Sequence, residues 1–303
     1  MVKTLALEPA YQACETLAYS HYENFPVASI FLPRRIRRAV CVIYAFARTV
    51  DDIADEGTAS IDERLGELSL YEHALTDLGN NINAITIAST TASTESHGAT
   101  LPIFLALKDV ILQYNLPVSL FLDLLQAFKQ DVIKNEHDTL EAIMDYCKHS
   151  ANPVGRLLLH LTQTATPENL SNSDAICTAL QLINFMQDLD SDLHKRNRCY
   201  IPLSEMQSLQ VTRWDLLQGK ETPEIHQLIE QQLSRAQALL TQGSPLGNRL
   251  KGLFGFEIRL IIQGGQLIVN KLIKRKNLYR RPTLKPWHWP ILIWRALRSL
   301  ELR

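Results

Sequence analysis

The sequence predicts an all-α protein, a single domain in which a bundle of helices encloses a central apolar cavity. Apolar residues recur at i, i+3 and i+4 spacing along most of the chain, whereas alternating β patterns are almost absent. Aspartates also repeat at helical spacing inside two otherwise apolar segments that lie far apart in the chain. Such polar stripes on buried helices indicate a shared interior space, as helix bundles provide.

The predicted helices follow the apolar periodicity. They span residues 10–24, 33–56, 60–78, 101–131, 139–164, 172–193, 222–243 and 249–276. Pro33, Pro102 and Pro117 lie where a first-turn proline is tolerated, because the N–H that it lacks has no intrahelical partner there. Thr139 indicates the start of a helix. Residues 79–100, rich in Ser, Thr and Asn, predict a polar surface loop and no domain boundary, so residues 1–303 are expected to form one domain.

Composition excludes several classes of protein. With 46% hydrophobic and 21% charged residues, the 303-residue chain reads as soluble and globular, and its net charge of −1 gives no reason to expect a nucleic-acid partner. The five cysteines form no CxxC pair, which favours a reducing compartment and buried thiols. No signal peptide and no membrane-spanning run of about 18 apolar residues is evident, so we expect a cytoplasmic protein.

The first acidic stripe lies in the predicted helix 33–56. At 100° per residue, Tyr44, Arg48, Asp51 and Asp55 fall on one side of this helix. Asp52 stands directly beside them in sequence and is a further candidate ligand.

The second acidic stripe consists of Asn184, Asp188 and Asp192, which share one side of the predicted helix 172–193. Apolar residues surround it, so this helix belongs in the interior. They are Ile176, Leu180, Leu182, Ile183, Phe185, Met186 and Leu189. Unpaired carboxylates there would cost several kcal/mol each. Arg48 cannot neutralise the aspartates of both stripes, and the simplest additional cation is Mg²⁺, which prefers oxygen ligands and bridges carboxylates to phosphates.

Two interpretations of the stripes remain open at this level. One interpretation is that each stripe is an ordinary solvated helix face, since single motifs carry false-positive risk. Alternatively, Mg²⁺ held on both stripes around an apolar cavity would suit the removal of diphosphate from an apolar carbon, with dry walls protecting the resulting carbocation. The chain contains no GxSxG, HExxH or Walker A motif and no GxGxxG after a strand, and metal-assisted ionisation needs no nucleophilic triad.

These motifs resemble those of the squalene/phytoene synthase family, from His21 to about Trp294. The family's first motif matches residues 44–55, its second matches 181–202, and its tyrosine-containing helix matches 146–155. The resemblance implies the isoprenoid synthase type of helical bundle.

Departures from the common family pattern point to one branch. Residues 21–27, His-Tyr-Glu-Asn-Phe-Pro-Val, replace Ser-x-Ser-Phe, and residues 150–155, Ser-Ala-Asn-Pro-Val-Gly, replace a Val-Ala-Gly segment. Both segments are similar to those of the family members that act in bacterial hopanoid biosynthesis. That resemblance implies conversion of presqualene diphosphate and water into hydroxysqualene and diphosphate through a carbocation, with two or three Mg²⁺ ions and no nicotinamide or flavin.

The resemblance and the chemistry together imply roles for individual residues. The expected metal ligands are Asp51, Asp55, Asn184, Asp188 and Asp192. The expected catalytic residues are Tyr44, Arg48, Tyr146, Asn184 and Tyr200. The expected substrate-binding residues are His21, Phe25, Arg48, Ser150, Asn152, Gln181 and Arg198. Aromatic faces can stabilise a passing cation, although core packing is the alternative role for each ring.

The group that positions the capturing water is less well defined. His149, Ser150 and Asn152 are the unusual polar residues near Tyr146, and the alternative role for Ser150 and Asn152 is to form a kink before Pro153.

The C-terminal third carries two further candidates for binding. The basic run from Lys271 to Arg281 either caps a solvated helix end or reaches a diphosphate or an anionic membrane. The tail 282–303 combines tryptophans, aliphatic residues and arginines, which suits peripheral contact with the inner face of the membrane or packing on the bundle.

Two competing functions remain. One is head-to-head condensation of two prenyl diphosphates, as in squalene or phytoene synthesis, and the other is a non-catalytic helical assembly factor. The partners expected are a prenyl diphosphate and neighbouring enzymes of the pathway.

Overall fold

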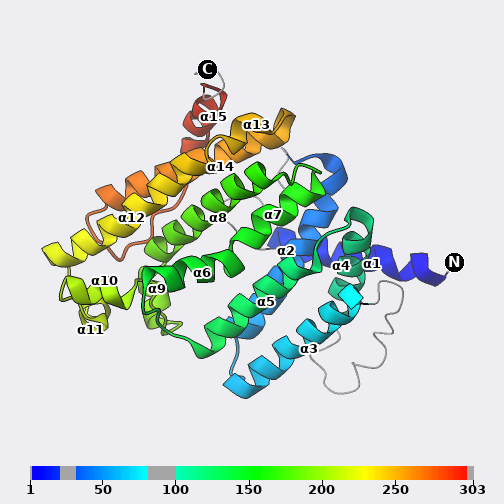
Figure 1. Ribbon diagram of the computed structural model, residues 1–303, viewed down its shortest axis with the longest axis horizontal. Coiled ribbons are helices and arrows are strands. Elements are labelled where there is room, and N and C mark those ends of the chain that lie inside the picture. Colours follow the sequence, from blue (N-terminus) through cyan, green and yellow to red (C-terminus); the bar gives the residue numbers. More distant parts are fainter. Residues whose placement is uncertain (1, 21–31, 81–99, 299–303) are drawn as a thin grey trace. The chain divides into compact units, whose positions relative to one another are not determined.

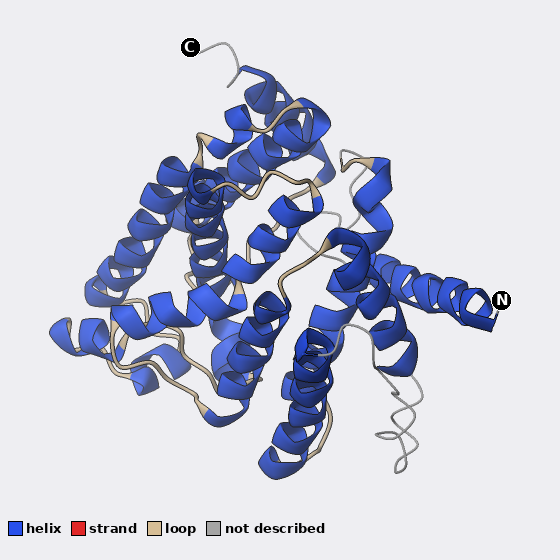
Figure 2. Cartoon of the chain, turned by 45° about the vertical axis from the view of Figure 1, so that its right-hand side comes forward, coloured by secondary structure: helices blue, strands red, loops and turns tan. Residues whose placement is uncertain are grey.

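A computed structural model describes residues 2–20, 32–80 and 100–298. Helices account for nearly all of the regular structure in these ranges, and no strand occurs within them; the only β pairing there is an isolated bridge between Glu136 and Cys199 (Figure 2). The all-α prediction is therefore confirmed. Of the predicted polar loop, residues 81–99 lie outside the described residues, whereas Gly79 and Asn80 end a helix.

The chain divides into two compact units, each of which is described by itself. Unit 1 comprises residues 1–133 and 156–165, and unit 2 comprises residues 134–155 and 166–303. The single domain expected from the sequence stays a prediction.

Unit 1 is built around the helix that carries the first acidic stripe. Its helices are α1 (Val2–Ser20), α2 (Arg34–Asp55), α3 (Ile61–Asn80), α4 (Thr100–Tyr114) and α5 (Val118–Ile133) (Figure 1). α2 packs against the other four, and its fully buried Phe46 meets the ring of Phe121 edge-on at 5.5 Å. Tyr71 of α3 lies 6.4 Å from Phe46, so aromatic packing holds the helix of the first stripe in place.

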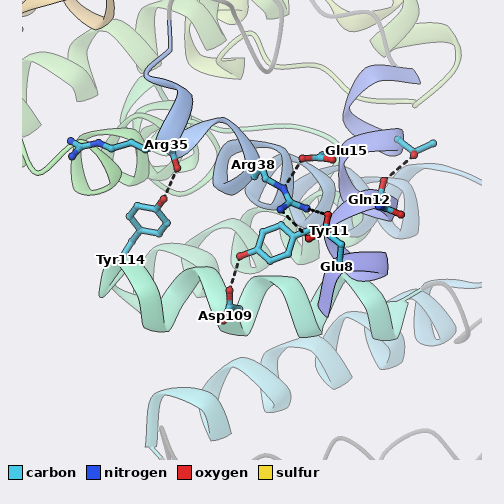
Figure 3. Close-up of polar contacts among 9 residues, drawn as sticks. Glu8, Tyr11, Gln12, Glu15, Arg35, Arg38, Asp109 and Tyr114 are labelled. Atoms are coloured by element: carbon cyan, nitrogen blue, oxygen red, sulfur yellow. Dashed lines mark hydrogen bonds and ion pairs between the residues drawn. The ribbon is translucent and has the colours of Figure 1, made fainter. Parts of the chain in front are cut away.

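Polar contacts attach α1 to its neighbours (Figure 3). The Tyr11 hydroxyl donates to Asp109 at 2.8 Å, and burial raises the pKa of that phenol above its ordinary value. Arg38 of α2 binds Glu8 at 2.7 Å and Glu15 at 2.9 Å, with its guanidinium 4.5 Å from the centre of the Tyr11 ring. These contacts fix the N-terminal half of α2.

Unit 2 contains the second stripe. Its helices are α6 (Leu140–Ser150), α8 (Pro167–Gln187), α9 (Leu189–His194), α10 (Leu203–Ser208), α11 (Arg213–Leu217), α12 (Pro223–Gly243), α13 (Leu246–Arg249), α14 (Gly252–Lys274), the 3₁₀ turn η3 (Pro286–His288) and α15 (Trp289–Arg298). α7 (Asn152–Leu161) begins in unit 2 and continues into unit 1. α8 packs most extensively on α12, and a side chain at Gly243 would collide with Ile176 and the Asn172 carbonyl, so this glycine permits the close approach.

Several predicted helices are interrupted where the apolar period continues. The segment 101–131 breaks between α4 and α5, where Asn115 adopts a left-handed φ of 50° ahead of Pro117. The segment 139–164 breaks at Ala151, as the kink before Pro153 suggested, and Thr139 caps α6 through its hydroxyl as predicted. Among the described helices, α14 alone is long and apolar enough to cross a membrane, and 61% of its most apolar window is buried within the protein.

Candidate functional site

The first acidic stripe lies along one side of α2, because α2 is a continuous helix through Asp55. Arg48 forms ion pairs with Asp52 at 2.5 Å, with Glu56 at 2.8 Å and with Asp51 at 3.5 Å. Glu56, which the sequence interpretation did not single out, follows the helix directly and completes the acidic surroundings of the guanidinium.

The second stripe keeps its alignment through a bend in the backbone. α8 ends at Gln187 and α9 begins at Leu189, with Asp188 between them. The Asp188 N–H still donates to the Asn184 carbonyl at 2.8 Å, and the Asp192 N–H donates to the Asp188 carbonyl at 2.8 Å. The three residues therefore remain one turn apart on the same side, as predicted.

The surroundings of the second stripe are apolar. No residue from Leu180 to Leu189 is exposed, and Asp192 is buried, whereas neighbouring Asp190 points to solvent and pairs with His194 at 3.4 Å. An ordinary solvated helix face does not describe this stripe.

Arginines provide the positive charge around these carboxylates. Arg281 binds Asp188 at 2.6 Å, and Arg196 binds Asp192 at 2.9 Å. Burial nevertheless raises the pKa of Asp192 to about 6, against the opposing charges of Arg196 and buried Arg198. Burial thus disfavours the charged form of Asp192, which lies one turn from the carboxylate of Asp188. Together the two carboxylates provide oxygen donors suited to a divalent cation such as Mg²⁺.

The basic run from Lys271 to Arg281, at the end of α14 and just after it, reaches the second stripe. Arg275 donates to the Met186 carbonyl at 3.0 Å, and Gln187 donates to the Pro282 carbonyl at 2.8 Å. Lys271 donates to the Thr283 carbonyl at 2.8 Å. These contacts hold Arg281 against Asp188, so the run is more than a solvated helix end.

Four buried rings form an aromatic cluster beside the stripe, consisting of His137, Tyr146, Phe185 and Tyr200. Phe185, next to Asn184 in the chain, stacks on Tyr200 with centroids 4.0 Å apart. Tyr146 lies 5.5 Å from Tyr200 and 6.0 Å from Phe185. The structure thus brings together the two tyrosines that were predicted separately.

Pairing of two short segments places His137 in the aromatic cluster. Glu136 and Cys199 form the isolated bridge, the Cys199 N–H donates to the Asn135 carbonyl at 2.8 Å, and the Leu203 N–H donates to the His137 carbonyl at 2.9 Å. The imidazole consequently lies 5.8 Å from the Tyr200 ring and 5.4 Å from the Tyr146 ring. No local sequence signal indicates this position, since it depends on a contact between distant segments.

His137 should make stability depend on pH. Burial lowers its pKa to about 4, so the folded protein keeps it neutral at pH values where an unfolded chain, titrating near 6.5, binds a proton. The contribution of His137 to the free energy of unfolding is at its maximum above pH 6.5. It falls as the pH drops from 6.5 to 4 and changes no further below pH 4. The loss should reach about 3 kcal/mol, measured by urea unfolding across this range.

A matched pair of variants isolates this contribution. His137→Phe should remove the dependence, so that its stability relative to wild type improves as the pH falls. His226→Phe, which removes an exposed imidazole on α12, should leave the dependence in place. Parallel stability curves for wild type and His137→Phe would contradict the assignment.

The remaining predicted residues have varied environments. Asn152 is buried and accepts a hydrogen bond from Thr178 at 2.9 Å, which joins α7 to α8. His149 lies 2.8 Å from the Asp145 carbonyl of its own helix, and the buried Ser150 hydroxyl has no hydrogen-bond partner among the described residues. Tyr44 and Gln181 are half-buried on α2 and α8. His21 and Phe25 lie outside the described residues.

The two stripes belong to different units. The first stripe is in unit 1, whereas the second stripe and the aromatic cluster are in unit 2. Within the described ranges, no group of three or more His, Cys, Asp or Glu side chains is gathered for a metal ion. That the two stripes act together around one ligand stays a prediction.

Comparison with known proteins identifies relatives over almost the whole chain. A family model described as squalene/phytoene synthase matches residues 19–288. The hydroxysqualene synthase of Rhodopseudomonas palustris is 32% identical over 282 residues, which cover 93% of this chain and 90% of that protein. The hydroxysqualene synthase of Zymomonas mobilis is 33% identical, covering 86% of this chain and 82% of that protein.

Solved structures are similar in fold. The squalene synthase HpnC from Alicyclobacillus acidocaldarius has a TM-score of 0.77 and 34% identity, covering 92% of this chain and 97% of that one. A dehydrosqualene synthase solved with a ligand also has a TM-score of 0.77, at 20% identity, and covers 99% of this chain and all of that one.

Proposed function

Since the chain belongs to the squalene/phytoene synthase family, we propose that it converts presqualene diphosphate and water into hydroxysqualene and diphosphate. The main support for this proposal is the second stripe, whose carboxylates lie in an apolar segment that also contributes Phe185 to the aromatic cluster. Charge on one side and π faces on the other match a substrate that has an anionic diphosphate head and an apolar body.

The polar residues act on the head of the substrate. Asp51, Asp55, Asn184, Asp188 and Asp192 would hold Mg²⁺. When bound, Mg²⁺ would neutralise the charge that develops on the departing diphosphate. Arg48, Arg198 and Arg281 would bind diphosphate oxygens, for which a planar guanidinium is suited. Arg281 pairs with Asp188 at 2.6 Å, which places its guanidinium next to this proposed metal ligand.

The apolar residues act on the body of the substrate. Breaking the bond between carbon and oxygen leaves its electron pair on diphosphate and a cyclopropylcarbinyl cation on the hydrocarbon. Tyr146, Phe185 and Tyr200 would face this cation and exclude bulk water while it rearranges. One water oxygen then forms the new bond to carbon and loses its proton, so no reductant is consumed.

Product analysis tests the proposed reaction. Purified protein with presqualene diphosphate and Mg²⁺, without any reductant, should give hydroxysqualene and one diphosphate per turnover, identified by mass spectrometry. Unchanged substrate, or squalene formed only after a reductant is added, would contradict the proposal.

One observation favours a second function. The solved relative with 34% identity is described as a squalene synthase, so head-to-head condensation of two prenyl diphosphates is the competing reaction. Incubation with farnesyl or geranylgeranyl diphosphate separates the two reactions, because only a condensing enzyme would form presqualene diphosphate or phytoene from them.

We place the protein in the cytoplasm, where neighbouring pathway enzymes would supply its substrate.

A further inference from the structure

The C-terminal helix α15 presents an apolar face to solvent. Leu292 and Ala296 are fully buried where α15 packs on α14 (Figure 1), and Arg259 of α14 donates to the Ala296 carbonyl at 2.9 Å. Exposed large apolar residues here are Trp287 (72% exposed) of η3, and Ile291 (42%), Ile293 (37%), Trp294 (53%) and Leu297 (52%) of α15. Ile291, Trp294 and Leu297 recur every three residues and so lie on one side of α15. Together with Trp287 of η3, we call them the α15 face.

The stretch of sequence that contains the α15 face carries charge of one sign. Residues 258–300 contain ten Lys and Arg and no Asp or Glu. The whole chain has a net charge of −1, so this stretch contributes +10 and the remainder −11. Lys285 and Arg298 are exposed at the two ends of the face, and the Arg298 guanidinium lies 4.8 Å from the centre of the Trp294 ring.

We propose that the α15 face docks on the surface of an anionic phospholipid bilayer. Tryptophan prefers the level of the headgroups, where its ring is apolar and its N–H stays solvated. Isoleucine and leucine on the same side would enter the boundary of the acyl chains, as the apolar side of an interfacial helix does. Lys285 and Arg298 would meet lipid phosphates, each attracted by the negative surface potential.

A bilayer accounts for this charge better than a second copy of the chain does. In a two-fold dimer the same patch meets itself, so the basic residues flanking the α15 face would oppose one another. Anionic lipid supplies charge complementary to Lys285 and Arg298 at the two ends of the face. The proposal does not rest on the function proposed above, although an apolar substrate dissolved in a membrane would be delivered close to the protein.

Vesicle flotation tests the proposal with the full chain. The protein should float with vesicles of phosphatidylcholine that contain about one third phosphatidylglycerol, and about 0.5 M salt should weaken this binding. Trp287→Ala/Trp294→Ala should lower the vesicle partition coefficient about tenfold or more. Lys285→Glu/Arg298→Glu should lower it about tenfold on anionic vesicles, with little effect on phosphatidylcholine alone.

Matched controls come from elsewhere in unit 2. Trp214→Ala removes a comparably exposed tryptophan on α11, and Lys148→Glu reverses an exposed charge on α6, so both should bind like wild type. Three of the four tryptophans lie in residues 287–294. In a Trp214→Phe background, vesicles should therefore shift tryptophan emission to the blue.

Two results would overturn the proposal. One is equal flotation of wild type and Trp287→Ala/Trp294→Ala. The other is a wild-type dimer that the same double variant converts to a monomer, with no vesicle binding by either, since a second copy would then cover the α15 face. Neither readout requires turnover, so a failure here is distinguishable from a failure of the proposed reaction.

Discussion

Asp188→Ala should lower the rate of diphosphate release from presqualene diphosphate about a thousandfold or more. Asp188 occupies the bend between α8 and α9, and its backbone links Asn184 to Asp192 within the second stripe. Removing its carboxylate would take away a proposed metal ligand and leave Arg281 without its partner. Because the charge that Mg²⁺ neutralises develops during ionisation, the loss should appear in kcat more than in KM.

Asp190→Ala is the matched control for this variant. Asp190 lies two residues further along, outside the stripe, exposed and paired with His194. Its replacement should leave the rate within about twofold of wild type. Thermal stabilisation by Mg²⁺ together with inorganic pyrophosphate gives a readout that does not require turnover, and Asp188→Ala should lose it. Full activity of Asp188→Ala would show that Asp188 is not a required metal ligand.

The two stripes should behave as one functional unit despite their separation in the sequence. Asp55→Ala alone should reduce kcat about a hundredfold to a thousandfold, comparably to Asp188→Ala. If both carboxylates serve one diphosphate, the double variant should be no more than about tenfold slower than the slower single variant.

Comparing the single and double variants tests whether the stripe in unit 1 and the stripe in unit 2 act on the same substrate group. Single-turnover rates of wild type, both single variants and the double variant complete the cycle. Multiplicative losses in the double variant would mean that the stripes act independently, and a fully active Asp55→Ala would exclude the first stripe from the reaction.

Much of the site follows from local rules of helix geometry. The i, i+4 spacing placed Asn184, Asp188 and Asp192 on one side, and the apolar residues between them indicated a buried helix. The rule for residues before proline suggested the kink at Ala151, but the break at Asn115 could not be read from the apolar period, which continues through it.

The other features depend on contacts between distant segments. His137 joins the aromatic cluster only because residues 135–138 pair with 199–204. Arg281 reaches Asp188 because the chain after α14 returns to the end of α8. A pattern in one stretch of sequence contains no information on such pairings. The tail was predicted as an anchor or a packed segment, and α15 combines a packed side with an exposed one because its apolar residues surround the helix.

A crystal structure with Mg²⁺ and inorganic pyrophosphate tests the central claim most directly. The account predicts carboxylate oxygens of Asp51 or Asp55 and of Asp188 or Asp192 at about 2.1 Å from Mg²⁺ ions that also bind the same pyrophosphate. Ions bound to one stripe alone, or stripes located on opposite exterior surfaces of the protein, would contradict it.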